Sequence, residues 1–236
     1  MASADPQDAC LNCAEPLGGR AYCGGCGQRS RHKRLRWRDL ARDVMQHCLD
    51  WDLPWPRTVV DLTRAPGQTA RAYLDGQRTR YANPVKYAFY ALLISTLLSG
   101  GLTQDLVRPE LSGWRRMLAT NLPLFMLLMS PVAMLALRVA FWRTRHNFVE
   151  IAVFVLYMLG QLSLLLALLG LVSAAVPAAW WAVVPALLAT VPPIYLLYAS
   201  ARFFEARLDH AIVASLVALT ATLWVAAQVW LRLAGL

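Results

Sequence analysis

Apolar residues gather in five long blocks in the last two thirds of this 236-residue chain. Each block holds about 20 residues with few charges, the length that a helix needs to cross about 30 Å of hydrocarbon. Asn83 is a good N-cap, and Pro84 suits the first helical position of the first block. We therefore predict an all-α integral membrane bundle of about five transmembrane helices, over residues 84–102, 117–140, 148–172, 179–199 and 210–231.

The residues before these blocks show shorter, amphipathic patterns. Over residues 37–51, apolar side chains recur at helical three- and four-residue spacing. This pattern predicts a helix that lies either in the membrane interface or on the protein's own cytosolic surface, and Pro54 is expected to end it. Two further short helices are predicted over residues 57–64, stopped by Pro66-Gly67, and near residues 69–75, capped by Gly76.

Small and polar residues inside the blocks indicate that the helices pack against one another. Gly160, Ala167 and Gly170 in the third block, and Ser95 in the first, let helix backbones approach closely. Gln161 lies deep in the third block and is expected to bridge helices. Three domains are predicted: a metal-binding head at 1–29, a basic amphipathic segment at 30–82 and a transmembrane domain at 83–236.

Composition agrees with a membrane protein, and the charge distribution adds the orientation of the chain in the membrane. Apolar residues make up 58% of the chain and charged residues only 16%, and the mean hydropathy is +0.42, which excludes an ordinary soluble domain. With the head in the cytosol, 19 of the 23 Lys and Arg residues lie on the inner side and 4 outside. The positive-inside rule then places the N-terminus in the cytosol and the C-terminus outside. No cleaved secretory signal is expected.

Four cysteines form two Cys-x-x-Cys turns in the head, namely Cys10, Cys13, Cys23 and Cys26. Two such turns bring four sulfurs to the corners of a tetrahedron, which suits Zn²⁺ as a structural cofactor with no open coordination position. The glycines around Cys26 let the second turn close tightly. A redox dithiol is the alternative. Cys48 stands apart and is interpreted as a small buried or interfacial residue.

A basic run, RSRHKRLRWR, follows the cysteines at residues 29–38. In a soluble protein it would suggest nucleic-acid binding. Before a membrane span, the same charges hold this end of the chain inside and attract anionic lipid headgroups. We favour the membrane surface as the partner of this run; a protein partner and nucleic acid remain as weaker alternatives.

Three motifs resemble one bacterial family, the membrane proteins of domain-of-unknown-function family 3667. They are the cysteine turns, the Gly-x-Arg-x-Arg-Tyr-x-x-Pro segment within residues 73–90, and HNFVEIAVFVLY at 146–157. The resemblance implies a multi-pass bacterial inner-membrane protein with an N-terminal zinc ribbon, and it implies no reaction. The family usually has Glu-His in the third motif, whereas here Glu150 is followed by Ile151.

Charged residues at the cytosolic ends of the predicted spans are the remaining candidates for chemistry, because ionisable groups near a membrane are costly. Glu150 and Asp209 either form ion pairs that fix helix ends or line a cytosolic vestibule with Arg78, Arg80 and Tyr81. Such a cluster would suit an anionic lipid headgroup or a phosphate. No phosphate-binding loop, nucleophile elbow or catalytic zinc helix is found in the sequence, so we expect no enzyme.

The function expected from the sequence is therefore a docking, adaptor or assembly module with a protein partner. The runner-up is a transporter or lipid-handling protein that binds an anionic substrate at the Arg and carboxylate cluster. A tether for nucleic acid is the third and weakest reading. The sequence leaves open whether the chain forms a homo-oligomer.

Overall fold

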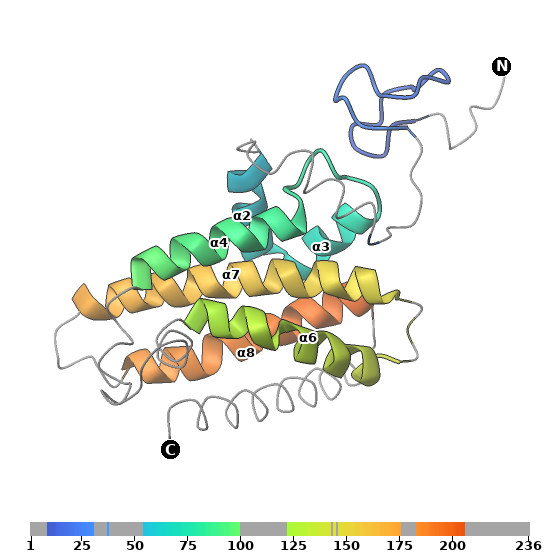
Figure 1. The fold of residues 1–236 in the computed structure, drawn as a ribbon. Coiled ribbons are helices and arrows are strands. Elements are labelled where there is room, and N and C mark those ends of the chain that lie inside the picture. The colour runs from blue at the N-terminus through green and yellow to red at the C-terminus, as the bar shows by residue number, and fades with distance from the viewer. Residues whose placement is uncertain are drawn as a thin grey trace.

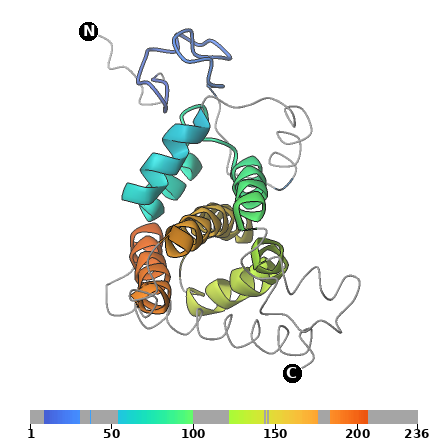
Figure 2. The ribbon, with the colours of Figure 1, turned by 90° about the vertical axis from the view of Figure 1, so that its left-hand side faces the viewer.

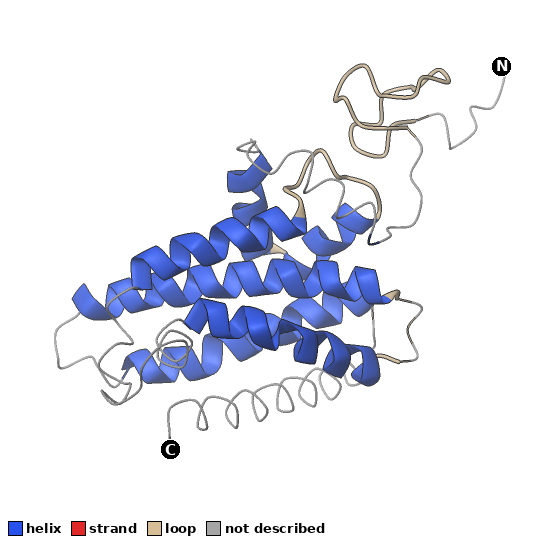
Figure 3. Ribbon diagram, viewed as in Figure 1, coloured by secondary structure: helices blue, strands red, loops and turns tan. Residues whose placement is uncertain are grey.

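The computed structural model describes residues 9–30, 37, 54–99, 122–142, 144, 146–175 and 183–205. Within these residues the fold is helical without strands (Figure 3), as the apolar pattern predicts. The helices are α2 (Pro54–Arg64), α3 (Pro66–Leu74), α4 (Pro84–Ser99), α6 (Leu122–Ala140), α7 (Phe148–Ala175) and α8 (Val183–Phe204). The predicted helix over 37–51 lies outside the described residues except for Trp37, and the predicted span over 210–231 lies wholly outside them.

Helix α7 is the centre of the bundle. Seen end-on, it is surrounded by α4, α6, α8 and the pair α2–α3 (Figures 1 and 2). The five consecutive residues from Ile151 to Val155 are all buried, so this part of α7 is covered on every side. Most helices in globular proteins bury only one apolar stripe. The continuous apolar run in the sequence is therefore explained by neighbours all round.

Close helix packing occurs where the sequence predicts it, at Gly160. A Cβ there would lie 2.8 Å from the Tyr87 ring and 3.2 Å from the Ala88 Cα. Only a glycine allows α4 to lie this near to α7. Ser95, on the same helix as Tyr87, is fully buried. The predicted approach of these helices is confirmed.

The helices α2 and α3 form a hairpin that packs on α7 and α8. The predicted stop at Pro66-Gly67 is correct for α2, but Pro66 also begins α3 directly, because proline is well suited to the first turn of a helix. Pro54 likewise begins α2, and the helix that it is predicted to end lies outside the described residues. At the hairpin turn, a Cβ on Gly67 would overlap the carbonyl oxygen of Ala199 and lie 2.7 Å from the Phe203 nitrogen. This contact fixes the hairpin against α8.

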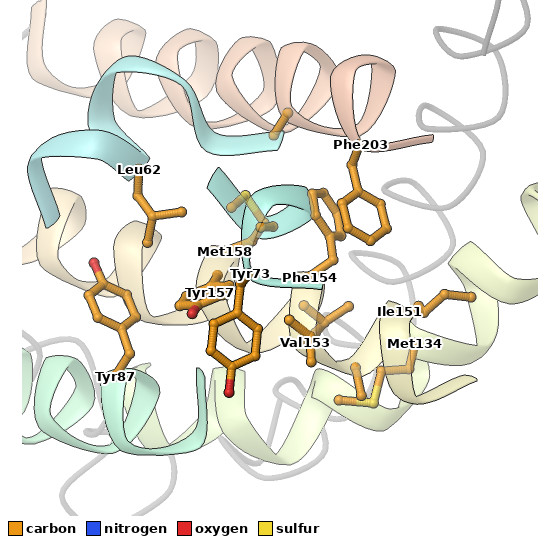
Figure 4. Packing of buried hydrophobic residues seen from close by; sticks show 14 of the residues in the cluster. Leu62, Tyr73, Tyr87, Met134, Ile151, Val153, Phe154, Tyr157, Met158 and Phe203 are labelled. Carbon is orange, nitrogen blue, oxygen red and sulfur yellow. The ribbon is translucent and has the colours of Figure 1, made fainter. Parts of the chain in front are cut away.

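Buried polar side chains join the hairpin to the bundle. The Tyr87 hydroxyl donates to Gln161 Oε1, and Gln161 Nε2 donates to Thr63 Oγ1 at 2.8 Å. Gln161 therefore bridges α4, α7 and α2, as predicted. A second bond runs from the Tyr157 hydroxyl to the Ala82 carbonyl at 2.6 Å. The Tyr157 side chain lies among the buried residues of the core (Figure 4). Such satisfied networks specify one packing arrangement, since each buried group left unpaired costs about 1–3 kcal/mol.

The helix ends near α7's first turn meet in an aromatic cluster. The rings of Phe141 and Phe204 stack at 3.9 Å, and those of Phe154 and Phe203 at 4.6 Å. The His146 ring lies 5.1 Å from Phe203. Three helices, α6, α7 and α8, are thereby held together at the same end of the bundle.

Two described helices are long and apolar enough to cross a membrane, over Pro123–Ala140 and Phe148–Leu169, and Pro84–Leu98 is a shorter apolar helix. The described residues thus support two of the five predicted spans by length and composition. Two of the helices contain prolines, Pro131 in α6 and Pro192 and Pro193 in α8.

Candidate metal centre and its contact with the helical body

The two cysteine turns have the same backbone structure. In the first, the Cys10 N–H donates to the Glu15 carbonyl at 2.9 Å; in the second, the Cys23 N–H donates to the Gln28 carbonyl at 2.8 Å. An antiparallel bridge closes each turn, Ala9 to Pro16 and Tyr22 to Arg29. Each of these residues in the second turn lies thirteen positions after its equivalent in the first. The head therefore contains the same structural unit twice, and we call each copy a knuckle.

Each knuckle ends in a residue with left-handed backbone geometry. The Ala14 N–H donates to the Cys10 carbonyl at 2.8 Å, and the Gly27 N–H donates to the Cys23 carbonyl at 3.0 Å. These equivalent residues have φ angles of 60° and 71°. Glycine adopts this conformation freely, while alanine does so at a cost of about 1–2 kcal/mol. The first knuckle therefore carries backbone strain that the second avoids.

The four sulfurs lie close enough together for one metal ion. All four Sγ atoms of Cys10, Cys13, Cys23 and Cys26 are within 4.8 Å of one another, and the pairs Cys10–Cys26 and Cys13–Cys23 are 3.5 Å apart. Zinc–sulfur bonds of about 2.3 Å in a tetrahedron give sulfur–sulfur edges of about 3.8 Å. The predicted ligand set is thus brought together with the spacing that a four-thiolate site needs.

Backbone amides contact two of the sulfurs, in equivalent places. The Glu15 N–H lowers the pKa of the Cys13 thiol, but desolvation and the neighbouring thiols outweigh it and raise that pKa to about 12. Desolvation raises the pKa of Cys26, whereas the Gln28 N–H and the Asn12 side chain lower it to about 6. Cys13 therefore holds a proton that a metal ion must displace, whereas Cys26 is mostly a thiolate at neutral pH.

The side chain of Glu15 lies over the opposite knuckle. Its Oε2 is 3.8 Å from the Cys23 sulfur, and a Cβ on Gly25 would overlap this carboxylate. Two of the glycines around Cys26 therefore have different roles. Gly25 leaves room for Glu15, and Gly27 supplies the left-handed turn.

The equivalent residue in the second knuckle, Gln28, joins the head to the helical body. Its Oε1 accepts hydrogen bonds from the Thr79 hydroxyl at 3.1 Å and from the Thr79 N–H at 3.4 Å. The Gln28 side chain is only 2% exposed. Thr79 belongs to the loop between α3 and α4 (Figure 1). The sequence contains no pattern that pairs these two residues, and the contact was not predicted.

The same loop carries the predicted Arg and Tyr residues. Arg78 is half-buried, and the exposed Arg80 guanidinium lies 5.6 Å above the Tyr81 ring. Burial raises the pKa of Tyr81. Asn83 then accepts a hydrogen bond from the Val85 N–H at 2.9 Å, which makes it the N-cap predicted for α4.

Of the two predicted carboxylates, Glu150 lies within the described residues and Asp209 does not. Glu150 accepts a hydrogen bond from the Asn147 N–H at 2.9 Å and lies 3.3 Å from His146 Nδ1. This is one of the two bonds of a capping box at the start of α7, and it supports the helix-end role considered for Glu150. The gathering of both carboxylates with Arg78, Arg80 and Tyr81 into one vestibule stays a prediction.

Cys48 and most of the basic run also lie outside the described residues. Trp37 is described, and its ring lies 6.3 Å from that of Phe148, the first residue of α7. Trp37 therefore lies at the same end of the bundle as the aromatic cluster.

Residues 56–96 match the model of a family described as a protein of unknown function, DUF3667. The matched segment covers nearly all of α2, then α3, the loop with Arg78, Arg80 and Thr79, and most of α4. The resemblance to this family is thereby confirmed over the segment with the Gly-x-Arg-x-Arg-Tyr-x-x-Pro motif, whereas the cysteine turns and residues 146–157 lie outside the match. No curated protein and no solved structure matches the chain.

Proposed function

We propose that the chain is a multi-pass protein of the bacterial cytoplasmic membrane that presents a cytosolic zinc ribbon as a docking module for a protein partner. The observation that carries the proposal is the combination of an apolar outer surface on the helices with a separate four-cysteine head held against their connecting loop. The head supplies the recognition surface, and the helices anchor and orient it.

The outer surface of the bundle supports a lipid environment. Large apolar side chains are exposed on α4, α6 and α8 and just after α6, and they include Phe89, Leu93, Leu97, Leu135, Val139, Trp142 and Ile194. Water-soluble monomers rarely expose apolar surface on so many elements. On α4 the exposed residues recur every four positions, so one whole face of the helix is apolar. Lipid chains are the environment in which such a surface is stable.

The charge distribution supports the proposed orientation. Arg57 and Arg64 on α2 and Arg80 in the α3–α4 loop are exposed, and they lie on the same part of the chain as the head. Basic residues near a span hold that side in the cytosol and are drawn to anionic headgroups. The ribbon then faces the cytosol, where thiols stay reduced and available to Zn²⁺.

The structure of the head supports docking over catalysis. Four cysteine ligands leave no open position for a substrate on zinc, so the ion would serve to fold the module. The surface of the head exposes Tyr22 by 59% and Leu11 by 49%. Aromatic side chains of this kind are frequent anchors at protein interfaces. The bond between Gln28 and Thr79 gives this surface a fixed direction relative to the helices.

Site-specific photo-crosslinking in living cells tests the proposal. A photoreactive amino acid at Tyr22 should give a discrete adduct with a second protein, and the same group at the exposed Val60 on α2 serves as the matched control. Cys23→Ser should abolish the Tyr22 adduct while the protein still resists extraction from membranes by carbonate.

Two outcomes would contradict the docking role. One is an adduct that persists at full yield in Cys23→Ser, because recognition would then not need the folded head. The other is an adduct that contains only a second copy of the chain, which would make the head a homo-oligomer contact instead.

A further inference from the structure

A cavity lies between α3 and the end of α8, away from the metal centre. It has a volume of about 430 Å³, within the lower part of the range of about 300–1,000 Å³ that small-molecule sites occupy. Its charged lining residues are Arg71, Asp75, Arg202 and Glu205, and Gln68 and Gln77 add amide groups. The cavity thus combines two positive and two negative side chains with neutral hydrogen-bond donors.

Arg71 is the fixed part of this cavity. Its guanidinium donates to the Phe203 carbonyl and pairs with the Glu205 carboxylate. Burial lowers the pKa of Arg71, and the charge of Asp75 opposes that effect. Arg71 therefore forms the wall that ties α3 to the end of α8, and its charge is already matched within the protein.

Arg202 and Asp75 are more accessible. Both side chains are exposed, and the Arg202 guanidinium lies 5.6 Å above the ring of Tyr198. A guanidinium presents a planar set of donors that fits phosphate oxygens in pairs. A carboxylate such as Asp75 accepts hydrogen bonds from an ammonium group. One wall of the cavity therefore suits an anion and the other a cation.

An apolar stripe continues from the cavity along the same face of α8. Tyr198 and Ile194 precede Arg202 at four-residue spacing, and they are 42% and 63% exposed. At 1.5 Å per residue, the stripe from Arg202 to Ile194 is about 12 Å long. A lipid fits this arrangement, with its headgroup in the polar cavity and one acyl chain against the apolar stripe of α8.

From this juxtaposition we infer that the α3–α8 cavity binds a zwitterionic aminophospholipid of the cytosolic leaflet, with its phosphate at Arg202 and its primary ammonium at Asp75. The inference rests on the membrane placement proposed above. The formal charges of the four ionisable lining residues sum to zero, so a zwitterionic headgroup keeps the cavity neutral. An anionic headgroup would instead leave one uncompensated negative charge beside Asp75 and Glu205.

Native mass spectrometry of the delipidated, detergent-purified full chain tests the inference. The probes are phosphatidylethanolamine and phosphatidylglycerol with identical acyl chains, titrated separately. Wild-type protein should bind phosphatidylethanolamine more tightly, and Arg202→Gln should weaken that binding about tenfold. Asp75→Asn should reduce the preference between the two lipids about fivefold. Arg20→Gln removes an equal charge from an exposed site in the head and should change neither value.

Several results would overturn the inference. Equal binding of both lipids to the wild type would refute the role of the ammonium group, and equal effects of Arg202→Gln and Arg20→Gln would refute the role of the cavity. Displacement of the lipid by millimolar inorganic phosphate would identify a free phosphate site instead. Carbonate extraction separates the two proposals: release of the wild type from membranes refutes the membrane placement, whereas retention with unselective lipid binding refutes only the cavity assignment.

Discussion

The equivalence of Ala14 and Gly27 gives a prediction in which two substitutions act in opposite directions. Both residues have positive φ at the same place in the repeated knuckle, and a Cβ on Gly27 would meet no atom within 4 Å. Gly27→Ala therefore adds backbone strain of about 1–2 kcal/mol without a clash. Restricting the unfolded chain offsets about 0.4–1 kcal/mol of it, which leaves a net loss of about 1 kcal/mol. Ala14→Gly reverses both effects and gains about the same amount.

Metal affinity measures this difference, because folding of so small a head is coupled to metal binding. Competition for Zn²⁺ against a chromophoric chelator should show about fivefold weaker binding for Gly27→Ala and about fivefold tighter binding for Ala14→Gly. The double variant should return close to the wild type. Shifts of the same sign in both single variants would refute the knuckle repeat as the source of the strain. An unchanged affinity in Gly27→Ala would refute the coupling of head folding to the metal.

Three further predictions concern the head, the helix contacts and the buried polar network. Cys23→Ser should lose the bound metal and unfold the head while membrane insertion is kept, as metal analysis and membrane fractionation would show; loss of insertion would contradict the independence of the two parts. Gly67→Ala should lower the melting temperature in detergent more than Gly160→Ala, because its Cβ meets backbone atoms and that of Gly160 mainly a tyrosine ring that can shift; the reverse order would contradict the packing. Tyr157→Phe should cost about 1–3 kcal/mol in chemical unfolding by leaving the Ala82 carbonyl unpaired, and no loss would mean that this bond is not formed.

Local signals in the sequence are sufficient for several parts of the fold. The spacing of the four cysteines predicts their gathering, Asn83 predicts the start of α4, and Gly160 predicts a close helix contact. Each of these depends on the geometry of a few neighbouring residues or on the absence of a side chain. The prolines show the limit of such signals, because Pro54 and Pro66 are compatible both with the end of one helix and with the start of the next.

Contacts between distant segments are not readable from the sequence in this way. The bond from Gln28 to Thr79 spans 51 residues, and the pairing of Arg71 with the end of α8 spans more than 130. Each side chain is an ordinary polar residue in an exposed-looking loop or helix turn. Their partners are fixed only by the way in which α3 packs on α8 and the head meets the α3–α4 loop. The α3–α8 cavity was missed for this reason.

The central position of α7 has a consequence for synthesis of the chain. Tyr87 and its partner Gln161 are 74 residues apart, so at about 5–20 residues per second the ribosome delivers the second about 4–15 s after the first. During that interval α4 already exists without the helix against which its inner side rests, and its tyrosine hydroxyl is without its final acceptor. The inner side of the nascent α4 therefore stays uncovered until α7 has been synthesised.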